Sequence, residues 1–287
     1  MSPSYAILDN RSVIHLGGPE AKDFLQGLIT NDVEKLETAG AIYGALLTPQ
    51  GKFLHDFIVF KLDGGMALDC EAARKDDLIR RLTMYRLRSK VTIEDVSDGY
   101  LVAAMWDGKA APELDSAGAL FPDPRVAALG WRAVLARDTA VATLEQDDWT
   151  AATPEDYDRR RLALGVPDGS RDLLVDKSFL LEGNFEELNG VDFDKGCYVG
   201  QENTTRQKHR GVVRKRFMRV DIQGPTPAPG TPVMLGDKEA GTMRSSADGA
   251  GMALLRLEYV TKAEQAGEPL VAGEARLTPV KPDWASF

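Results

Sequence analysis

The chain has 287 residues, of which 43% are hydrophobic, and it carries a net charge of −9. This length can bury a full core and suggests roughly two domains. Two cysteines are too few for a disulfide framework and show no metal-ligand spacing. No stretch approaches the ~20 apolar residues of a membrane span. We therefore expect a soluble protein of a reducing compartment, located in the cytoplasm and not bound to a membrane.

The first half of the chain alternates short apolar runs with two helical patterns. Helical periodicity begins near residue 20 and returns over 73–88. The expected strands cover 5–8, 12–16, 41–47, 53–61, 66–70, 91–95, 100–106 and 131–135. Residues 107–125 are rich in Ala, Gly, Pro and Asp, which predicts a loop.

The second half begins with helices and ends with short strands. A helix is expected from Pro154, capped by Thr153 and ending near 165–167, and another over 201–209. Short strand-like runs punctuated by glycine and proline follow at 232–235, 240–244, 251–257, 269–271 and 275–278. This spacing predicts a small antiparallel barrel.

Residues 195–202, Lys-Gly-Cys-Tyr-Val-Gly-Gln-Glu, are the most informative stretch of the chain. They place Cys197 between two glycines, which permit a tight turn, and close to Lys195, whose ammonium group favours the thiolate. Free cysteines are usually buried and inert. Cys197 is therefore either a functional thiol or a small packing residue. The other cysteine, Cys70, is expected to pack at a strand end.

Residues 195–219 form a basic strip in an otherwise acidic chain. They hold eight basic side chains and one acidic one, Glu202, for a local charge of +7. This pattern argues against general binding to nucleic acids or membranes and suits a small anionic ligand. The alternative is a solvated face paired with the acidic body. Arg206 lies four residues after Glu202, so it can form a helical ion pair or hold a ligand carboxylate.

Two acidic side chains occur in apolar surroundings. Asp56 shares one face of an expected strand with Leu54 and Ile58, while His55 points to the other face. A carboxylate on an apolar face is costly unless it is paired or functional. Asp56 is therefore a functional group or a strand-end residue that meets water. Glu182 lies in an apolar turn before the cysteine stretch.

The cysteine stretch, followed by Asn-Thr-Thr-Arg at 203–206 and Gly-Val-Val-Arg-Lys-Arg at 211–216, resembles the YgfZ family. That family is the bacterial relative of mitochondrial iron–sulfur assembly factors that descend from the glycine-cleavage aminomethyltransferase, the T-protein. Residues 195–202 carry its K-G-C-Y-x-G-Q-E signature in full. Further matches occur in the same order at 24–27, 30–32, 48–51 and 161–167, so the resemblance covers nearly the whole chain.

The resemblance implies an α+β fold: a T-protein-like cloverleaf of two folate-binding subdomains over 1–215, then an antiparallel barrel over 216–287. Tetrahydrofolate, or a one-carbon-substituted form, would lie in the central channel. Asp56 is similar to a T-protein carboxylate that faces the folate. Asp69 falls at a folate-contacting asparagine, and Glu182 matches a second acidic position.

The remaining expected folate-binding residues are Tyr198, Gly200, Gln201 and Arg206. The expected functional thiol is Cys197, supported by Lys195 and Asp56. Two departures argue against aminomethyl transfer: His55 stands where T-protein has an aspartate, and Ala163 where it has a glutamate.

We therefore interpret the chain as a monomeric, tetrahydrofolate-binding accessory factor for the maturation or repair of iron–sulfur proteins. Its expected partners are folate and iron–sulfur client or assembly proteins. Two alternatives stay open: a tetrahydrofolate-dependent aminomethyl or methyl transferase, and a folate-independent interaction module.

Overall fold

The computed structural model describes residues 2–108, 112, 118–145, 149–211 and 213–287. The chain divides into two compact units. Unit 1 comprises Met1–Pro49, Leu54–Tyr157 and Leu188–Gln201. Unit 2 comprises Gln50–Phe53, Asp158–Glu187 and Glu202–Phe287.

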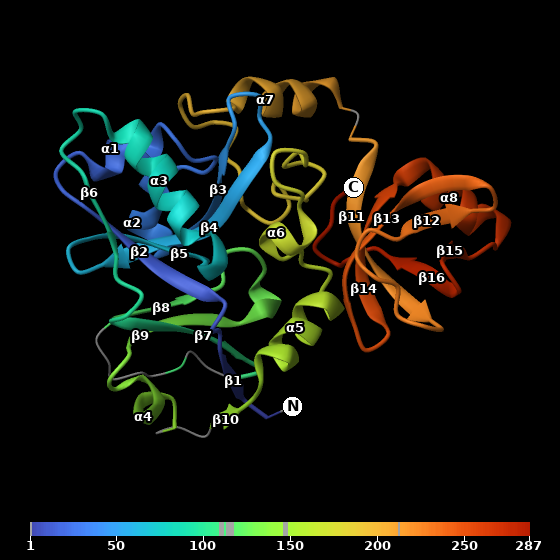
Figure 1. Cartoon of the computed structure of the whole chain (residues 1–287), viewed down its shortest axis with the longest axis horizontal. Coiled ribbons are helices and arrows are strands. Elements are labelled where there is room, and N and C mark those ends of the chain that lie inside the picture. Colours follow the sequence, from blue (N-terminus) through green and yellow to red (C-terminus); the bar gives the residue numbers. More distant parts are fainter. Residues whose placement is uncertain (1, 109–111, 113–117, 146–148, 212) are drawn as a thin grey trace. The chain divides into compact units, whose positions relative to one another are not determined.

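Unit 1 contains a five-stranded sheet in the order β3-β4-β5-β2-β6, with helices on one of its faces (Figure 1). Its strands are β2 (Arg11–Gly17), β3 (Ala41–Leu47), β4 (Phe53–Leu62), β5 (Gly65–Glu71) and β6 (Thr92–Asp95). Its helices are α1 (Ala21–Gln26), the 3₁₀ turns Val33–Lys35 and Ala72–Arg74, α2 (Leu36–Ala39) and α3 (Lys75–Arg86). Alternate residues of the strands join the apolar stripes of α1 and α3 in one core, which includes Leu25, Phe57 and Leu82.

A second five-stranded sheet of unit 1 has the order β10-β1-β7-β9-β8. Its elements are β1 (Ser4–Ile7), β7 (Tyr100–Trp106), β8 (Gly118–Pro122), the 3₁₀ turn Ala127–Leu129, β9 (Trp131–Ala136), α4 (Ala140–Leu144) and β10 (Thr150–Ala151). Side chains of the two sheets meet, since the rings of Phe60 on β4 and Phe121 on β8 lie 5.2 Å apart between centroids.

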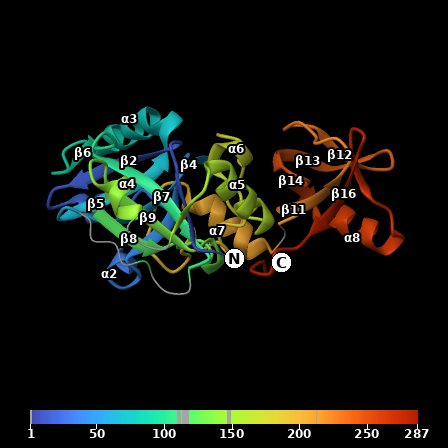
Figure 2. The same cartoon turned by 90° about the horizontal axis from the view of Figure 1, so that it is seen from below.

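Unit 2 contains a closed barrel in the order β11-β14-β13-β12-β15-β16 (Figure 2). Its strands are β11 (Lys215–Gln223), β12 (Pro232–Leu235), β13 (Lys238–Ala247), β14 (Ala250–Arg256), β15 (Leu270–Ala272) and β16 (Ala275–Val280). Helix α8 (Leu257–Ala266) contributes Val260 and Ala263 to the barrel core.

Three further helices lie between β10 and β11 in the sequence: α5 (Pro154–Ala163), α6 (Gly169–Asp172) and α7 (Gln201–Arg210). As predicted, Thr153 caps α5, because its hydroxyl accepts a hydrogen bond from the Asp156 amide at 3.2 Å. Gly165, two residues after the helix, has φ 70°, a conformation that favours glycine.

The structure confirms the predicted α+β class and the antiparallel barrel. Several elements were not predicted, among them α2, α4, α6, β8, β10, β11 and α8. The loop expected over 107–125 contains β8, and its residues 109–111 and 113–117 lie outside the described residues. Strand β11 was hidden by the basic residues that interrupt its apolar alternation, and α8 by the surrounding strand-like spacing.

Candidate functional site

Cys197 has an exposed thiol, and the residue two positions before it is buried. The Lys195 ammonium group donates hydrogen bonds to the backbone carbonyls of Gln26, Ile29 and Asn31, at 2.8, 2.7 and 2.7 Å. An ammonium group has three protons to donate, so all of them have acceptors within the fold. Lys195 therefore anchors the loop to the segment that follows α1.

Burial lowers the pKa of Lys195 to about 8. The described residues show no hydrogen bond between this ammonium group and Cys197. A role of Lys195 in favouring the Cys197 thiolate stays a prediction, and the contacts that the structure gives Lys195 are those of a positioning residue.

Residues 198–200 anchor the other side of the thiol. Tyr198 is buried, and its ring centroid lies 5.3 Å from Lys195 Nζ. Gly200 has φ 85°, so the backbone there favours glycine. Gly196 has no such conformation, and a Cβ atom added to it would meet nothing within 4 Å. The position that a side chain of residue 196 would take is therefore open space, next to the exposed Cys197.

The preceding loop is fixed to the segment around Thr30. The Thr30 hydroxyl donates to the Gly190 carbonyl at 2.6 Å, and the Asn31 side chain donates to the Asn189 carbonyl at 2.8 Å. Asp192 accepts hydrogen bonds from the Asp194 and Lys195 amides. The cysteine loop is thus held by buried polar contacts on its inner side.

The predicted basic strip is partly paired with acidic side chains. Arg206 forms the ion pair with Glu202 that the four-residue spacing predicts, and both side chains are exposed. Lys208 pairs with Glu186, and Arg216 pairs with the buried Glu187 at 2.8 Å. These contacts favour the alternative of a face paired with local acids over a free anion site.

Asp56 is buried in β4, and its Oδ2 accepts a hydrogen bond from the Tyr43 hydroxyl at 2.9 Å. Burial and the nearby Asp56 raise the pKa of Tyr43 well above its usual value. On the opposite face of the strand, as predicted, His55 contacts Asp77 of α3 at 2.8 Å. Burial lowers the pKa of His55 to about 4.

Asp69 shares a sheet face with Asp56. Ile58 lies opposite Asp69 in the antiparallel register of β4 and β5, and Asp56 is two residues from Ile58. Asp69 is fully buried and forms an ion pair with Arg11 at 2.6 Å. Its Oδ2 lies 3.6 Å from Nε of Arg132, a residue of the other sheet.

Arg132 belongs to a buried ionic cluster that sequence reasoning missed. Asp123 accepts hydrogen bonds from Arg125 at 2.7 and 2.9 Å and from Arg132 at 3.3 Å. Both guanidinium groups also donate to the Tyr157 hydroxyl. Burial acts to raise the pKa of Asp123, but Arg125 and Arg132 lower it to about 2.

Some buried polar atoms of this cluster form no hydrogen bond. Among the described residues, Asp69 Oδ2 and Arg132 Nε and Nη1 have no hydrogen-bond partner. A signal for it existed in the sequence, since Arg132 interrupts an apolar strand as Asp56 does.

Glu182 lies in unit 2, where it stabilises a turn. Its side chain accepts a hydrogen bond from the Phe179 amide at 3.2 Å, and its carbonyl accepts one from the Phe217 amide at 2.9 Å. Gln201 begins α7, and its amide bonds the Tyr198 carbonyl at 3.2 Å. The predicted site residues thus form two groups in unit 1. The cysteine loop holds Lys195, Cys197, Tyr198, Gly200 and Gln201, and the carboxylate face holds Asp56 and Asp69. Glu182 and Arg206 belong to unit 2.

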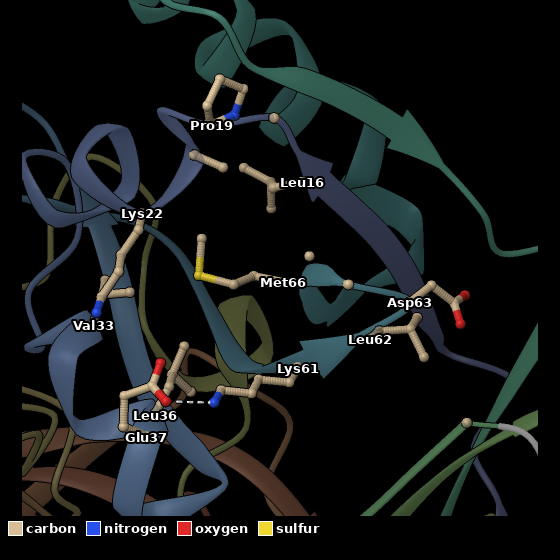
Figure 3. A pocket seen from close by; sticks show the side chains of 15 residues that line it. Leu16, Pro19, Lys22, Val33, Leu36, Glu37, Lys61, Leu62, Asp63 and Met66 are labelled. Carbon is tan, nitrogen blue, oxygen red and sulfur yellow. Dashed lines mark hydrogen bonds and ion pairs between the residues drawn. The ribbon is translucent and has the colours of Figure 1, made fainter.

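A pocket of about 480 Å³ opens elsewhere in unit 1, beside the β4–β5 hairpin. Figure 3 shows the Met66 side chain projecting into it, with the Lys61–Glu37 ion pair at its edge. None of the predicted site residues lines this pocket. The described residues contain no group of three or more His, Cys, Asp or Glu side chains placed to hold a metal ion. Within the same residues, no helix is long and apolar enough to cross a membrane.

Two five-stranded sheets followed by a closed barrel define an aminomethyltransferase-like fold. Residues 8–120 match the GCVT N-terminal domain, and residues 214–287 match the CAF17 C-terminal beta-barrel domain. The glycine cleavage system aminomethyltransferase T from Bartonella henselae has the same fold, with a TM-score of 0.76 over 98% of this chain and 85% of that one. At 14% identity this likeness concerns the fold alone.

The chain belongs to the family of the iron–sulfur cluster assembly factor IBA57. The mouse member is 33% identical, with 96% of this chain and 84% of the mouse protein covered. The human member is 34% identical, with 88% and 77% covered. These relatives confirm the wider iron–sulfur assembly group to which the sequence resemblance pointed.

Both relatives are named as mitochondrial proteins. The predicted cytoplasmic location conflicts with this finding and is wrong. It rested on few cysteines and on the lack of long apolar segments, and these features do not separate one reducing compartment from another.

Proposed function

We propose that this chain acts in iron–sulfur cluster assembly by presenting the Cys197 thiol to a partner protein. The observation that carries the proposal is the exposure of Cys197 between the buried residues Lys195 and Tyr198. Free cysteines are usually buried, and Cys70 follows that rule at 2% exposed. A thiol that is exposed on a firmly anchored loop suits contact with another molecule. Membership of the IBA57 family supports iron–sulfur proteins as that partner.

The chemistry of the thiol fits this role. Cysteine thiolates hold iron–sulfur clusters and also attack disulfides, with a second thiolate as the leaving group. In the proposal the loop supplies a fixed position and Cys197 supplies the sulfur atom. The client protein supplies the remaining cluster ligands, since the described residues of this chain contain no such set.

The test replaces each cysteine in turn. Cells that lack their own IBA57-family protein would express the wild type, Cys197→Ser or the matched control Cys70→Ala, at levels checked by immunoblot. We expect iron–sulfur enzyme activity to be lost with Cys197→Ser and kept with Cys70→Ala. Unchanged activity with Cys197→Ser would remove the thiol from the function.

A folate is the proposed small-molecule ligand of the carboxylate face in unit 1. The support is chemical: Asp69 Oδ2 can accept a hydrogen bond, and Arg132 Nε and Nη1 can donate two. A pterin ring offers both donors and acceptors along its edge, so these side chains fit it. Asp56 lies on the same sheet face. When bound, a tetrahydrofolate would supply one-carbon chemistry.

Titration with 5-formyltetrahydrofolate tests this part separately. We expect saturable binding by the wild type and by Cys197→Ser, and binding weakened by about tenfold or more in Asp69→Asn, because a buried partner is lost. No saturable binding would contradict the folate proposal and favour an interaction module. Turnover of a methylated amine only with tetrahydrofolate, lost in Asp56→Asn, would instead favour the transferase alternative.

A further inference from the structure

The end of α3 carries an exposed apolar cluster. Only five large apolar side chains are exposed among the described residues, and three of them are Met84, Tyr85 and Leu87. Leu87 has 87% of its surface exposed and Met84 65%. Single exposed apolar residues are ordinary, but a cluster of them marks an interaction surface. We call residues 84–90 the basic tip, for the charges that accompany this cluster.

The basic tip carries positive charges that form no ion pair among the described residues. Residues 80–90 hold five basic side chains and no acidic one, in a chain with a net charge of −9. Arg80 and Arg81 pair with Asp77. The other three side chains have no ion pair among the described residues. These three are Arg86, Arg88 and Lys90.

The backbone of the basic tip is a turn that normally requires glycine. The Ser89 amide donates to the Arg86 carbonyl at 2.8 Å, which closes a four-residue turn. Leu87, its second residue, has φ 45° and ψ −106°, close to the first central position of a type II′ turn. A leucine there is strained, and its exposed side chain gains no burial in return.

The turn is also fixed in place. The Lys90 amide donates to Glu20 Oε2 at 3.1 Å. A Cβ atom on Gly18 would come within 2.3 Å of the Lys90 carbonyl oxygen, so the two loops pack backbone to backbone. A hollow beside them is lined by Glu20, Leu87, Arg88 and Ser89. The fold thus holds Leu87 in a costly and rigid conformation at the surface.

We propose that the basic tip docks an acidic protein surface, with Leu87 entering an apolar pocket flanked by carboxylates. Charge complementarity selects an acidic partner for Arg86, Arg88 and Lys90. Arginine, tyrosine and methionine are enriched in protein interfaces. Three cations of the tip have no ion pair, fewer than the about four to eight that clusters binding anionic lipid usually hold, and the net charge of −9 opposes approach to such a surface. This inference is independent of the proposed roles of Cys197 and folate.

The experiment selects ligands without assuming their identity. A random peptide library would be panned against the full chain, with counter-selection against Arg86→Glu/Arg88→Glu/Lys90→Glu. We expect the recovered peptides to combine Asp or Glu with Leu or Phe. Their binding should weaken about tenfold or more in the triple variant and in Leu87→Gly. Recovery of neutral or basic peptides, or of none that discriminates, would overturn the proposal.

Two matched controls separate docking from folding and from general charge. Leu87→Gly should raise the melting temperature, since glycine adopts this turn without strain, so loss of binding there is not loss of structure. Lys238→Glu/Arg256→Glu/Arg276→Glu makes the same charge change at exposed positions of unit 2 and should leave peptide binding intact. Equal losses in both triple variants would overturn the proposal. Tip-dependent binding to phosphatidylserine vesicles, with no discriminating peptide, would also overturn it in favour of a lipid surface.

Discussion

The cysteine loop and the carboxylate face of unit 1 use buried charge in opposite ways. In the loop, the Lys195 ammonium group donates three hydrogen bonds to backbone carbonyls, and the Cys197 thiol is exposed. In the face, charged side chains pair with one another, while polar atoms of Asp69 and Arg132 lack a hydrogen-bond partner. The first arrangement suits a partner that arrives from outside. The second is the arrangement at which we propose a small polar ligand.

The largest expected effect lies in the carboxylate face. Arg132→Leu removes one cation from a cluster with two buried carboxylates, Asp69 and Asp123. Leaving buried charges unpaired should lower the free energy of unfolding by about 3–5 kcal/mol. Urea unfolding measures this. A loss below about 1 kcal/mol would show that the cluster is not the rigid ionic core described above.

His55, on the opposite face of β4, should make the free energy of unfolding depend on pH. The pKa of His55 is about 4 in the fold, against 6.5 in an unfolded chain. The unfolded state therefore binds a proton first, and stability should fall by about 3 kcal/mol as pH drops from 6.5 to 4. His55→Gln should flatten this part of the stability profile, measured by unfolding at stepped pH. An unchanged slope would assign the acid sensitivity to other groups.

Lys195→Met tests the anchor of the cysteine loop. The substitution keeps an apolar stem but leaves the carbonyls of Gln26, Ile29 and Asn31 without this donor. We expect a loss of about 2 kcal/mol in the free energy of unfolding. Faster labelling of Cys197 by a thiol reagent, without global unfolding, would show that the loop has become mobile. An undisturbed loop would contradict the anchoring role.

The smallest effect on stability is expected at the thiol itself. Cys197→Ser changes one atom of an exposed side chain, so the free energy of unfolding should stay within about 0.5 kcal/mol of the wild type. Thermal and urea unfolding check this. A larger loss would mean that the thiol has a packing role, and the contrast between loop and face would fail.

The sequence predicted the elements with clear periodicity or turn chemistry. The strand Ala41–Leu47 and the start of α5 after Thr153 follow from apolar runs and a capping residue. Strand β11 was missed because three basic residues interrupt its alternation. The partner of Arg216, Glu187, is distant in the sequence.

The candidate site also has some features with a local sequence signal and others that depend on distant residues. The apolar context of Asp56 and the glycines around Cys197 are local signals, and the sequence displays them. The contact between Asp69 and Arg132, by contrast, joins residues of two different sheets. The use of Lys195 as an anchor depends on a segment more than 160 residues away. Such pairings are set by tertiary packing, which periodicity does not encode.

The closure of the barrel affects where aggregation of the chain begins. All six of its strands find neighbours around the ring, whereas the sheets of unit 1 end at β3 and β6 and at β8 and β10. Strands at a sheet border can pair with another chain. Aggregation under mild stress should therefore begin in unit 1, and a ligand bound there would keep the whole protein in solution as well as stabilise its fold.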